Sequence, residues 1–175
     1  MDKPVEKNEL DQIMEPFHRH GVEFIVVGGV AEQLHGGSRI TYDVDLCYRR
    51  SKDNFVRLAL ALKELNPSLR GAPPGLPFQL DAKTLEMGTN FTFDTAILPL
   101  DILGFLEPLG GYDEIRKRAV LYLNSGKELW TIEAEELLQI KLHLNRPKDQ
   151  ESIAQLRAIL KVRKENESQT RRDAQ

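Results

Sequence analysis

Three aspartates in this sequence stand where their carboxylates could act together on a metal ion. Asp43 and Asp45 alternate with apolar residues in the segment 40–48, which predicts a strand that is apolar on one face and acidic on the other. Residues two apart on a strand point to the same face. Two like charges about 4 Å apart repel by roughly 4 kcal/mol at an effective dielectric constant near 20. The pair therefore favours a bound divalent cation or a raised pKa.

Asp101 adds a third carboxylate, on a second strand that the pattern predicts at residues 98–103. Oxygen ligands of this kind favour Mg2+ or Mn2+. A site of three carboxylates can hold two metal ions roughly 4 Å apart, a spacing that suits in-line phosphoryl or nucleotidyl transfer. The alternative is that these aspartates have no site role. Asp43 and Asp45 would then be the solvent-facing residues of an alternating surface strand, and Asp101 would be a charged residue on an edge strand.

Gly28 and Gly29 follow an apolar segment at 23–27 and precede a helical pattern at 30–35. Small residues between a strand and the start of a helix let backbone N–H groups approach a phosphate closely. A plain tight turn is the alternative for this pair. Its interest comes from the Asp-x-Asp sequence that follows about fifteen residues later.

The elements that must position these residues alternate between helix and strand along the chain. Periodicity predicts helices at 10–20, 30–35, 54–65, 112–118, 133–144 and 149–164, and strands at 23–27, 40–48, 91–95, 98–103, 120–123 and 129–132. This order predicts an α/β (α+β) fold with a central mixed β-sheet flanked by helices and ending in C-terminal helices. We expect one domain over residues 1–165, a disordered tail at 166–175, and a long loop at 70–77 that could form a lid.

Composition excludes several classes of protein. Of the 175 residues, 41% are hydrophobic and 29% are charged, and no apolar run has the length of a membrane span. The N-terminal residues lack the pattern of a secretory signal, and the single cysteine, Cys47, excludes an internal disulfide, so we expect a cytoplasmic protein. The net charge of −3 gives no bulk attraction to nucleic acid. The basic stretch 141–172 could face a polyanion such as RNA, or could simply be a solvated helix face.

The motifs together resemble the nucleotidyltransferase superfamily of polymerase β, in which a Gly-Gly or Gly-Ser turn precedes Asp-x-Asp and a later strand aspartate. Here the pattern reads Gly28-Gly29, Asp43-x-Asp45 and Asp101. Arg39-x-Thr41-x-Asp43-x-Asp45 is similar to the AbiEii-type bacterial nucleotidyltransferases, a group that includes toxins of toxin–antitoxin systems. The segment 136–149, which ends in Arg-x-Lys-Asp, agrees with that group, and the resemblance spans residues 24–160.

The resemblance implies a role for each matching residue. Asp43, Asp45 and Asp101 would be the metal-binding and catalytic carboxylates, with Asp101 also acting as general base toward the acceptor hydroxyl. The implied nucleotide-binding residues are Gly28, Gly29, Ser38, Arg39, Thr41, Lys141 and Lys148. Ser38 enters this set because the turn has glycine at position 29, where better-known enzymes have serine. Lys141 could instead be a solvated lysine, and Lys148 with Asp149 a pair at a helix start.

The implied activity is transfer of a nucleoside monophosphate from an NTP to a hydroxyl, with Mg2+ or Mn2+. The acceptor could be a tRNA end, a protein or a small molecule such as an antibiotic. An antitoxin or another helical protein could serve as a partner. The alternative is a catalytically silent module of the same fold that binds nucleotide or protein. The sequence does not predict the base, the acceptor or the oligomeric state.

Overall fold

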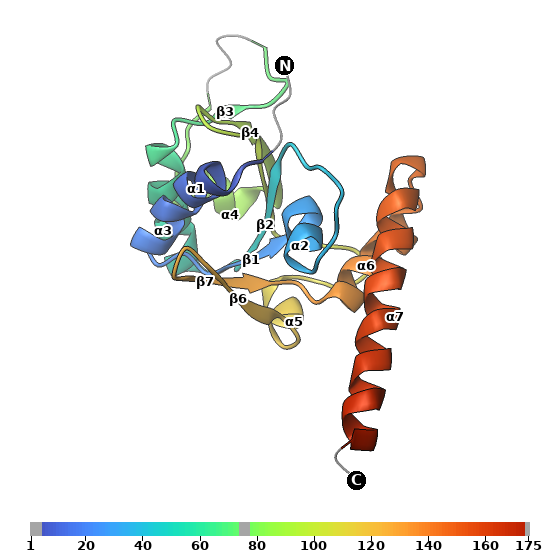
Figure 1. The fold of residues 1–175 in the computed structure, drawn as a ribbon. Helices are drawn as coiled ribbons and strands as arrows, with labels where there is room; N and C mark the ends of the chain where they lie inside the picture. The colour runs from blue at the N-terminus through green and yellow to red at the C-terminus, as the bar shows by residue number, and fades with distance from the viewer. Residues whose placement is uncertain (1–4, 74–77, 174–175) are drawn as a thin grey trace.

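A seven-stranded mixed β-sheet organises the part of the chain that the computed structural model describes, residues 5–73 and 78–173 (Figure 1). The strands are β1 (Phe24–Val27), β2 (Val44–Tyr48), β3 (Ser68–Leu69), β4 (Asn90–Asp94), β5 (Leu100–Leu103), β6 (Val120–Asn124) and β7 (Lys127–Thr131). The helices are α1 (Lys7–Arg19), α2 (Gly28–Leu34), α3 (Lys52–Glu64), α4 (Ala82–Met87), α5 (Tyr112–Arg116), α6 (Ala134–Leu144) and α7 (Gln150–Asp173), with a 3-10 turn at Pro147–Asp149. The predicted fold class, a mixed sheet with flanking and C-terminal helices, is confirmed.

Strand order places the predicted acidic strands side by side. The order is β3-β4-β5-β2-β1-β7-β6, so β2 lies between β5 and β1. β2 runs parallel to β5 and antiparallel to β1. These three strands form the centre of the core, where Ile25, Leu46 and Ile102 are fully buried. The sheet therefore brings residues more than fifty positions apart in the chain onto adjacent strands.

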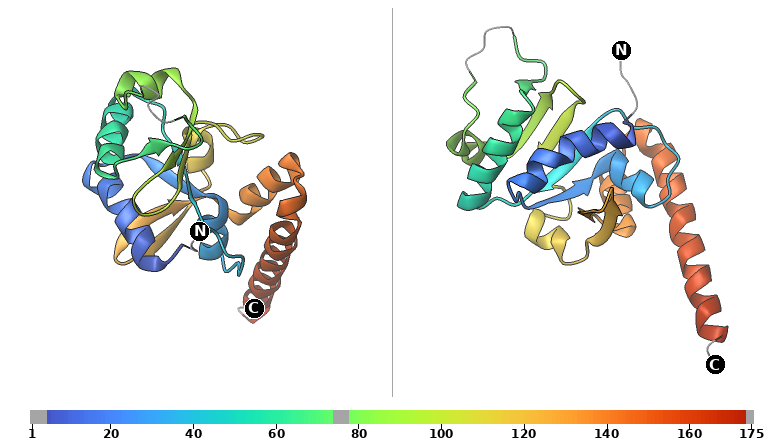
Figure 2. Two further views of the ribbon diagram at one scale, coloured as in Figure 1. Left: turned by 90° about the horizontal axis from the view of Figure 1, so that it is seen from above. Right: turned by 60° about the vertical axis from the view of Figure 1, so that its left-hand side comes forward.

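The helices form two groups about the sheet. α1 and α3 lie next to each other and bury apolar residues such as Phe17 and Leu62. α7 lies on the other side of the molecule from α3, packs against α6, and extends beyond the sheet with its C-terminal half (Figures 1 and 2). None of the helices among the described residues combines the length and apolar character that crossing a membrane requires.

The acidic strand is shorter than predicted. We expected a strand over 40–48, but β2 begins at Val44 and the residues before it form a loop. β1 has only four residues, and its last pair is Val27↔Asp45. The chain turns into α2 at Gly28, and β5 begins at Leu100 opposite Val44, so neither neighbouring strand extends alongside residues 40–43. Asp43 therefore lies in the loop before β2 rather than on the strand.

The predicted disordered tail is wrong for the described residues after Glu165, because α7 is one helix up to Asp173. The first half of α7 is anchored by buried residues such as Ile153 and Leu156. A helix that is already nucleated extends at little cost through residues that favour helix. The expected single domain remains a prediction.

Three further differences concern local elements. β3 and α4 were not predicted, since the segment around them has no clear period. Gly28 and Gly29 form the first turn of α2 rather than a separate turn before it. The possible lid at 70–77 lies partly outside the described residues, because positions 74–77 are not among them. His35 is buried at the end of α2, and its Nε2 lies 2.6 Å from the carbonyl oxygen of Ile132.

Candidate active site

The three predicted carboxylates meet at one end of β2. Asp45 lies on β2 directly opposite Asp101 on β5, and Asp43 comes from the loop that leads into β2. One oxygen from each carboxylate can be chosen so that all three lie within 4.8 Å of one another. This separation is short enough for a single divalent ion to contact all three side chains.

The proximity of these carboxylates changes their acidity. Burial, followed by the charges of Asp43 and Asp101, raises the pKa of Asp45 to about 7. Lys141 and a hydrogen bond from the Gly29 N–H act in the opposite direction. Burial, followed by the charges of Asp43 and Asp94, also raises the pKa of Asp101, while Arg70 opposes this rise. Without a cation the cluster therefore resists full ionisation.

These side chains fit a magnesium or manganese ion. All three ligands are carboxylate oxygens, the donors that hard divalent cations prefer. A divalent ion would offset the repulsion that raises the pKa of Asp45 and Asp101. The three aspartates are the one acidic or thiol cluster of this kind among the described residues.

The two glycines of α2 are required by the space around the carboxylates. A Cβ atom on Gly28, whose φ is +62°, would come within 2.0 Å of Asp45 Oδ2. A Cβ atom on Gly29 would come within 2.3 Å of Thr41 Oγ1. The glycines thus let the start of α2 approach β2 and the Thr41 loop. Their predicted contact with phosphate is a separate role and remains a prediction.

The loop before β2 holds Asp43 in place. The buried Thr41 donates a hydrogen bond from Oγ1 to Asp43 Oδ1 at 3.0 Å. Arg39 Nη1 lies 3.4 Å from Ser152 Oγ at the start of α7. The backbone N–H of Ser38 donates to Gln155 Oε1 at 2.9 Å, which ties Ser38 to α7.

One cavity of about 340 Å³ gathers nine of the ten predicted site residues. They are Gly28, Gly29, Arg39, Thr41, Asp43, Asp45, Asp101, Lys141 and Lys148. Ser38 is the exception and does not line the cavity. The cavity is therefore lined by both carboxylates and cations. That combination can hold a metal ion together with a phosphate chain.

Lys141 is part of a buried charge cluster and is not a solvated helix lysine. Its Nζ lies 3.4 Å from Glu32 Oε2 and 3.4 Å from Asp149 Oδ1. Arg146 Nε donates to the other oxygen of Asp149 at 2.5 Å. Sequence reasoning gave no site role to Glu32 or Arg146. The Arg-x-Lys-Asp motif could have indicated Arg146, but no local pattern points to Glu32.

Arg70 contacts the third carboxylate from the edge of the sheet. Its Nη2 lies 3.0 Å from Asp101 Oδ1 and also donates to the carbonyl oxygen of Phe93 at 2.8 Å. Its Nε donates to Asp94 at 3.1 Å. The guanidinium is therefore held in place, and it gives Asp101 a fixed cationic neighbour. Sequence reasoning missed Arg70, which lies in the segment predicted as a loop.

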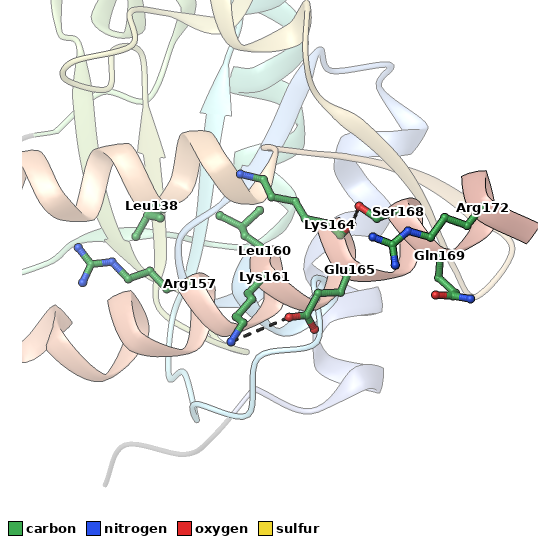
Figure 3. Close-up of a pocket in the computed structure, with 9 residues that line it drawn as sticks. All are labelled: Leu138, Arg157, Leu160, Lys161, Lys164, Glu165, Ser168, Gln169 and Arg172. Atoms are coloured by element: carbon green, nitrogen blue, oxygen red, sulfur yellow. Dashed lines mark hydrogen bonds and ion pairs between the residues drawn. The ribbon is translucent and has the colours of Figure 1, made fainter.

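A larger groove of about 750 Å³ runs along α7 and has different chemistry (Figure 3). It is lined by Leu138 of α6 and by residues of α7 that include Arg157, Lys161 and Lys164. One carboxylate lines it, that of Glu165, which pairs with Lys161 at 3.9 Å. This groove has no carboxylate cluster, and we assign the candidate chemistry to the smaller acidic cavity.

No family model and no curated protein matches this sequence. Solved structures do match. The lincosamide antibiotic adenylyltransferase LnuA, bound to lincomycin, superimposes with a TM-score of 0.62 at 16% identity, covering 90% of this chain and 99% of that one. The fold is the nucleotidyltransferase fold.

A second nucleotidyltransferase structure supports the same assignment of the fold. ANT(2'')-Ia in complex with adenylyl-2''-tobramycin superimposes with a TM-score of 0.58 at 13% identity, covering 96% of this chain and 95% of that one. The likeness extends over nearly the full length of both proteins. At these identities it establishes a shared fold, and the chemistry must be argued from the residues of this chain. The AbiEii-type subfamily remains a prediction.

Proposed function

We propose that this protein is a metal-dependent nucleotidyltransferase that moves a nucleoside monophosphate from an NTP to a hydroxyl group. One observation carries the proposal: Asp43, Asp45 and Asp101 place oxygens within 4.8 Å of one another in a cavity that Lys141, Arg146 and other cations also line. A nucleotidyltransferase needs both features, because its substrate is an NTP with a bound metal ion. The carboxylates hold the metal ion, and the cations balance the negative charge of the phosphates.

Each group then has a defined task in the reaction. Asp43 and Asp45 would hold Mg2+ or Mn2+, which when bound supplies Lewis-acid stabilisation of phosphate charge. Lys141 would balance the negative charge of the phosphates. Asp101 would accept the proton of the acceptor hydroxyl while the hydroxyl oxygen forms its bond to the α-phosphorus. The bond from the α-phosphorus to the bridging oxygen breaks at the same time, and pyrophosphate leaves with that electron pair.

The first test is metal-dependent nucleotide binding. Each non-hydrolysable NTP is titrated with Mg2+ into the wild type, and calorimetry should show binding of the preferred nucleotide. We expect the affinity of the Asp43→Ala/Asp45→Ala variant for that nucleotide to be at least 100-fold weaker. The expected loss follows because two of the three oxygen ligands are removed. The preferred base is identified in the same titrations.

A matched double variant controls for loss of negative charge. Asp53→Ala/Asp113→Ala removes two exposed carboxylates that lie outside the cavity, and it should bind like the wild type. Equal binding by the wild type and the Asp43→Ala/Asp45→Ala variant would refute the metal site. Metal-dependent binding without pyrophosphate release across RNA, protein and small-molecule acceptors would favour the silent binding module instead.

The acceptor site is proposed to be a groove of about 640 Å³ beside the acidic cavity. Leu103 lines this groove and lies two residues after Asp101 on β5, so both side chains point to the same face of the sheet. Ile140 lines it from α6 and directly precedes Lys141. A molecule in the groove could therefore present a hydroxyl toward Asp101.

The groove favours a small molecule with an apolar surface over RNA. Apolar side chains line much of it, including Leu103, Phe105 and Leu144. Its one arginine, Arg50, already donates to the carbonyl oxygens of Gly88 and Glu86 at 2.5 and 2.8 Å. Nucleic-acid sites instead offer cations to the phosphate backbone. Lincomycin, which is bound in LnuA, and tobramycin, whose adenylylated form is bound in ANT(2'')-Ia, provide a first set of acceptors to assay.

Filling the groove should separate acceptor binding from nucleotide binding. We expect Ile140→Trp to lower nucleotidyl transfer to small-molecule hydroxyls at least tenfold, because the larger ring occupies the acceptor space. Nucleotide binding with Mg2+ should stay within about twofold of the wild type. Transfer is measured with radiolabelled NTP against lincomycin, tobramycin and an RNA pool. Leu60→Trp, at an exposed position on α3, is the control. Unchanged transfer in Ile140→Trp would place the acceptor elsewhere.

The motif likeness to AbiEii-type proteins supports a further proposal, a role within a toxin–antitoxin pair. Transfer to tRNA in the assay above would favour that role over modification of a small molecule. An antitoxin or helical partner would then be sought by co-purification. The wider function is thus decided by the acceptor that is labelled.

A further inference from the structure

Three charged side chains are buried together at the acidic cavity, and two of them, Lys141 and Asp149, line it. Glu32 of α2, Lys141 of α6 and Asp149 have exposed fractions of 1%, 5% and 1%. The Lys141 ammonium lies between the two carboxylates, 3.4 Å from an oxygen of each. Such groups are almost never fully buried unless they are paired. A cluster of this kind at the wall of a candidate active site calls for a functional explanation.

The buried carboxylate of Glu32 depends on Lys141 for its charge compensation, whereas that of Asp149 has a second partner. Neither carboxylate oxygen of Glu32 has a hydrogen-bond donor among the described residues, and Lys141 is its ion-pair partner there. Asp149 also accepts a hydrogen bond from Arg146. A buried carboxylate without hydrogen bonds costs free energy. Glu32 therefore adds little to folding that an apolar residue could not provide.

The position of Glu32 links Lys141 to the rest of the cavity. Glu32 lies one turn after Gly28 and Gly29 on the short helix α2, and both glycines line the cavity. Lys141 comes from a different helix, α6, and lines the same cavity. The Glu32–Lys141 ion pair thus connects the two helices at the point where the phosphate chain would lie.

We propose that Glu32 is a positioning residue that fixes the Lys141 ammonium in the cavity and thereby sets the affinity for NTP. This inference rests on the proposed function, because it assigns Lys141 to the phosphates. A lysine side chain is long and flexible, and holding it before the nucleotide arrives removes part of the ordering cost of binding. Glu32 does not touch the nucleotide and acts through Lys141.

A double-mutant cycle tests whether Glu32 acts through Lys141. Calorimetry with Mg2+ and α,β-methylene ATP compares the wild type, Glu32→Gln, Lys141→Met and the double variant. We expect Glu32→Gln to weaken binding about tenfold in the wild type and less than twofold when Lys141 is already methionine, because coupled residues are not additive. Glu32→Asp keeps the charge with a shorter side chain, should weaken binding by an intermediate factor, and serves as a second variant if Glu32→Gln folds poorly.

Two further measurements separate positioning from a structural role. Glu136→Gln changes another buried carboxylate, which pairs with Arg118 rather than with Lys141, and it should leave nucleotide affinity unchanged. The double variant should melt at a higher temperature than Lys141→Met alone, because Lys141→Met leaves Glu32 buried without its cation.

The outcomes are distinct. Unchanged affinity in both Glu32→Gln and Glu32→Asp, or an equal loss with and without Lys141, would overturn the positioning role. Absence of metal-dependent binding of all four NTP analogues in the wild type would instead refute the proposed function itself.

Discussion

Replacing Asp101 with asparagine should lower the rate of nucleotidyl transfer by about a thousandfold, within the range that general-base catalysis contributes. Asparagine keeps the shape of the side chain but cannot accept the proton of the acceptor hydroxyl. We expect metal-dependent NTP binding to weaken only a few-fold, since Asp43 and Asp45 remain as ligands. Single-turnover transfer and calorimetry measure the two effects separately.

The neighbouring carboxylate Asp94 provides the control for that prediction. Asp94 accepts a hydrogen bond from the same Arg70 that contacts Asp101, but it does not line the cavity. Asp94→Asn should therefore transfer at close to the wild-type rate. If Asp101→Asn lost NTP binding and transfer to the same extent, its main role would be metal binding. Full activity in Asp101→Asn would exclude it as the base.

The parts of this site that could be predicted are those with a local pattern. Asp43 and Asp45 stand two apart beside β-branched and apolar residues, and Gly28-Gly29 ends an apolar strand. Strand and helix periods therefore located Asp45 and the two glycines with little help from the rest of the chain, whereas Asp43 lies in the loop before β2 and not on the strand that the period predicted. Asp101 also lies on a predicted strand, and the mixed sheet placed it opposite Asp45.

Contacts between distant segments could not be predicted. Glu32 looks like an ordinary polar helix residue in the sequence, and only the packing of α2 against α6 buries it beside Lys141. Arg70 reaches Asp101 because β3 pairs with β4 at the edge of the sheet, and no period indicated β3. The true start of β2 likewise depends on both partner strands, because β1 ends opposite Asp45 and β5 begins opposite Val44. Register and packing decide such features, and neither is a property of one segment.

The contribution of Asp45 to the stability of the metal-free protein should fall as the pH rises from about 4 to 8. The pKa of Asp45 is raised in the folded protein to about 7, mainly by burial, from an ordinary value of 3.8. A group with a raised pKa contributes its full stability below the unfolded value, and that stability is lost as the pH passes the folded value. The loss from Asp45 is at most about 4 kcal/mol. The raised pKa of Asp101 acts in the same direction.

Urea unfolding in EDTA at pH 5 and pH 8 measures this effect in the wild type and in Asp45→Asn. Asparagine cannot ionise, so the variant should lose much less stability between the two pH values and should be the more stable protein at pH 8. Saturating Mg2+ should restore stability to the wild type at pH 8 but not to the variant, because an ion that binds only the folded state stabilises it. An equal pH dependence in both proteins would mean that Asp45 ionises freely in the folded state. The expected result, a larger loss in the wild type, would instead show that Asp45 combines a cost to folding with a gain in metal binding, which is the trade-off expected of a functional carboxylate.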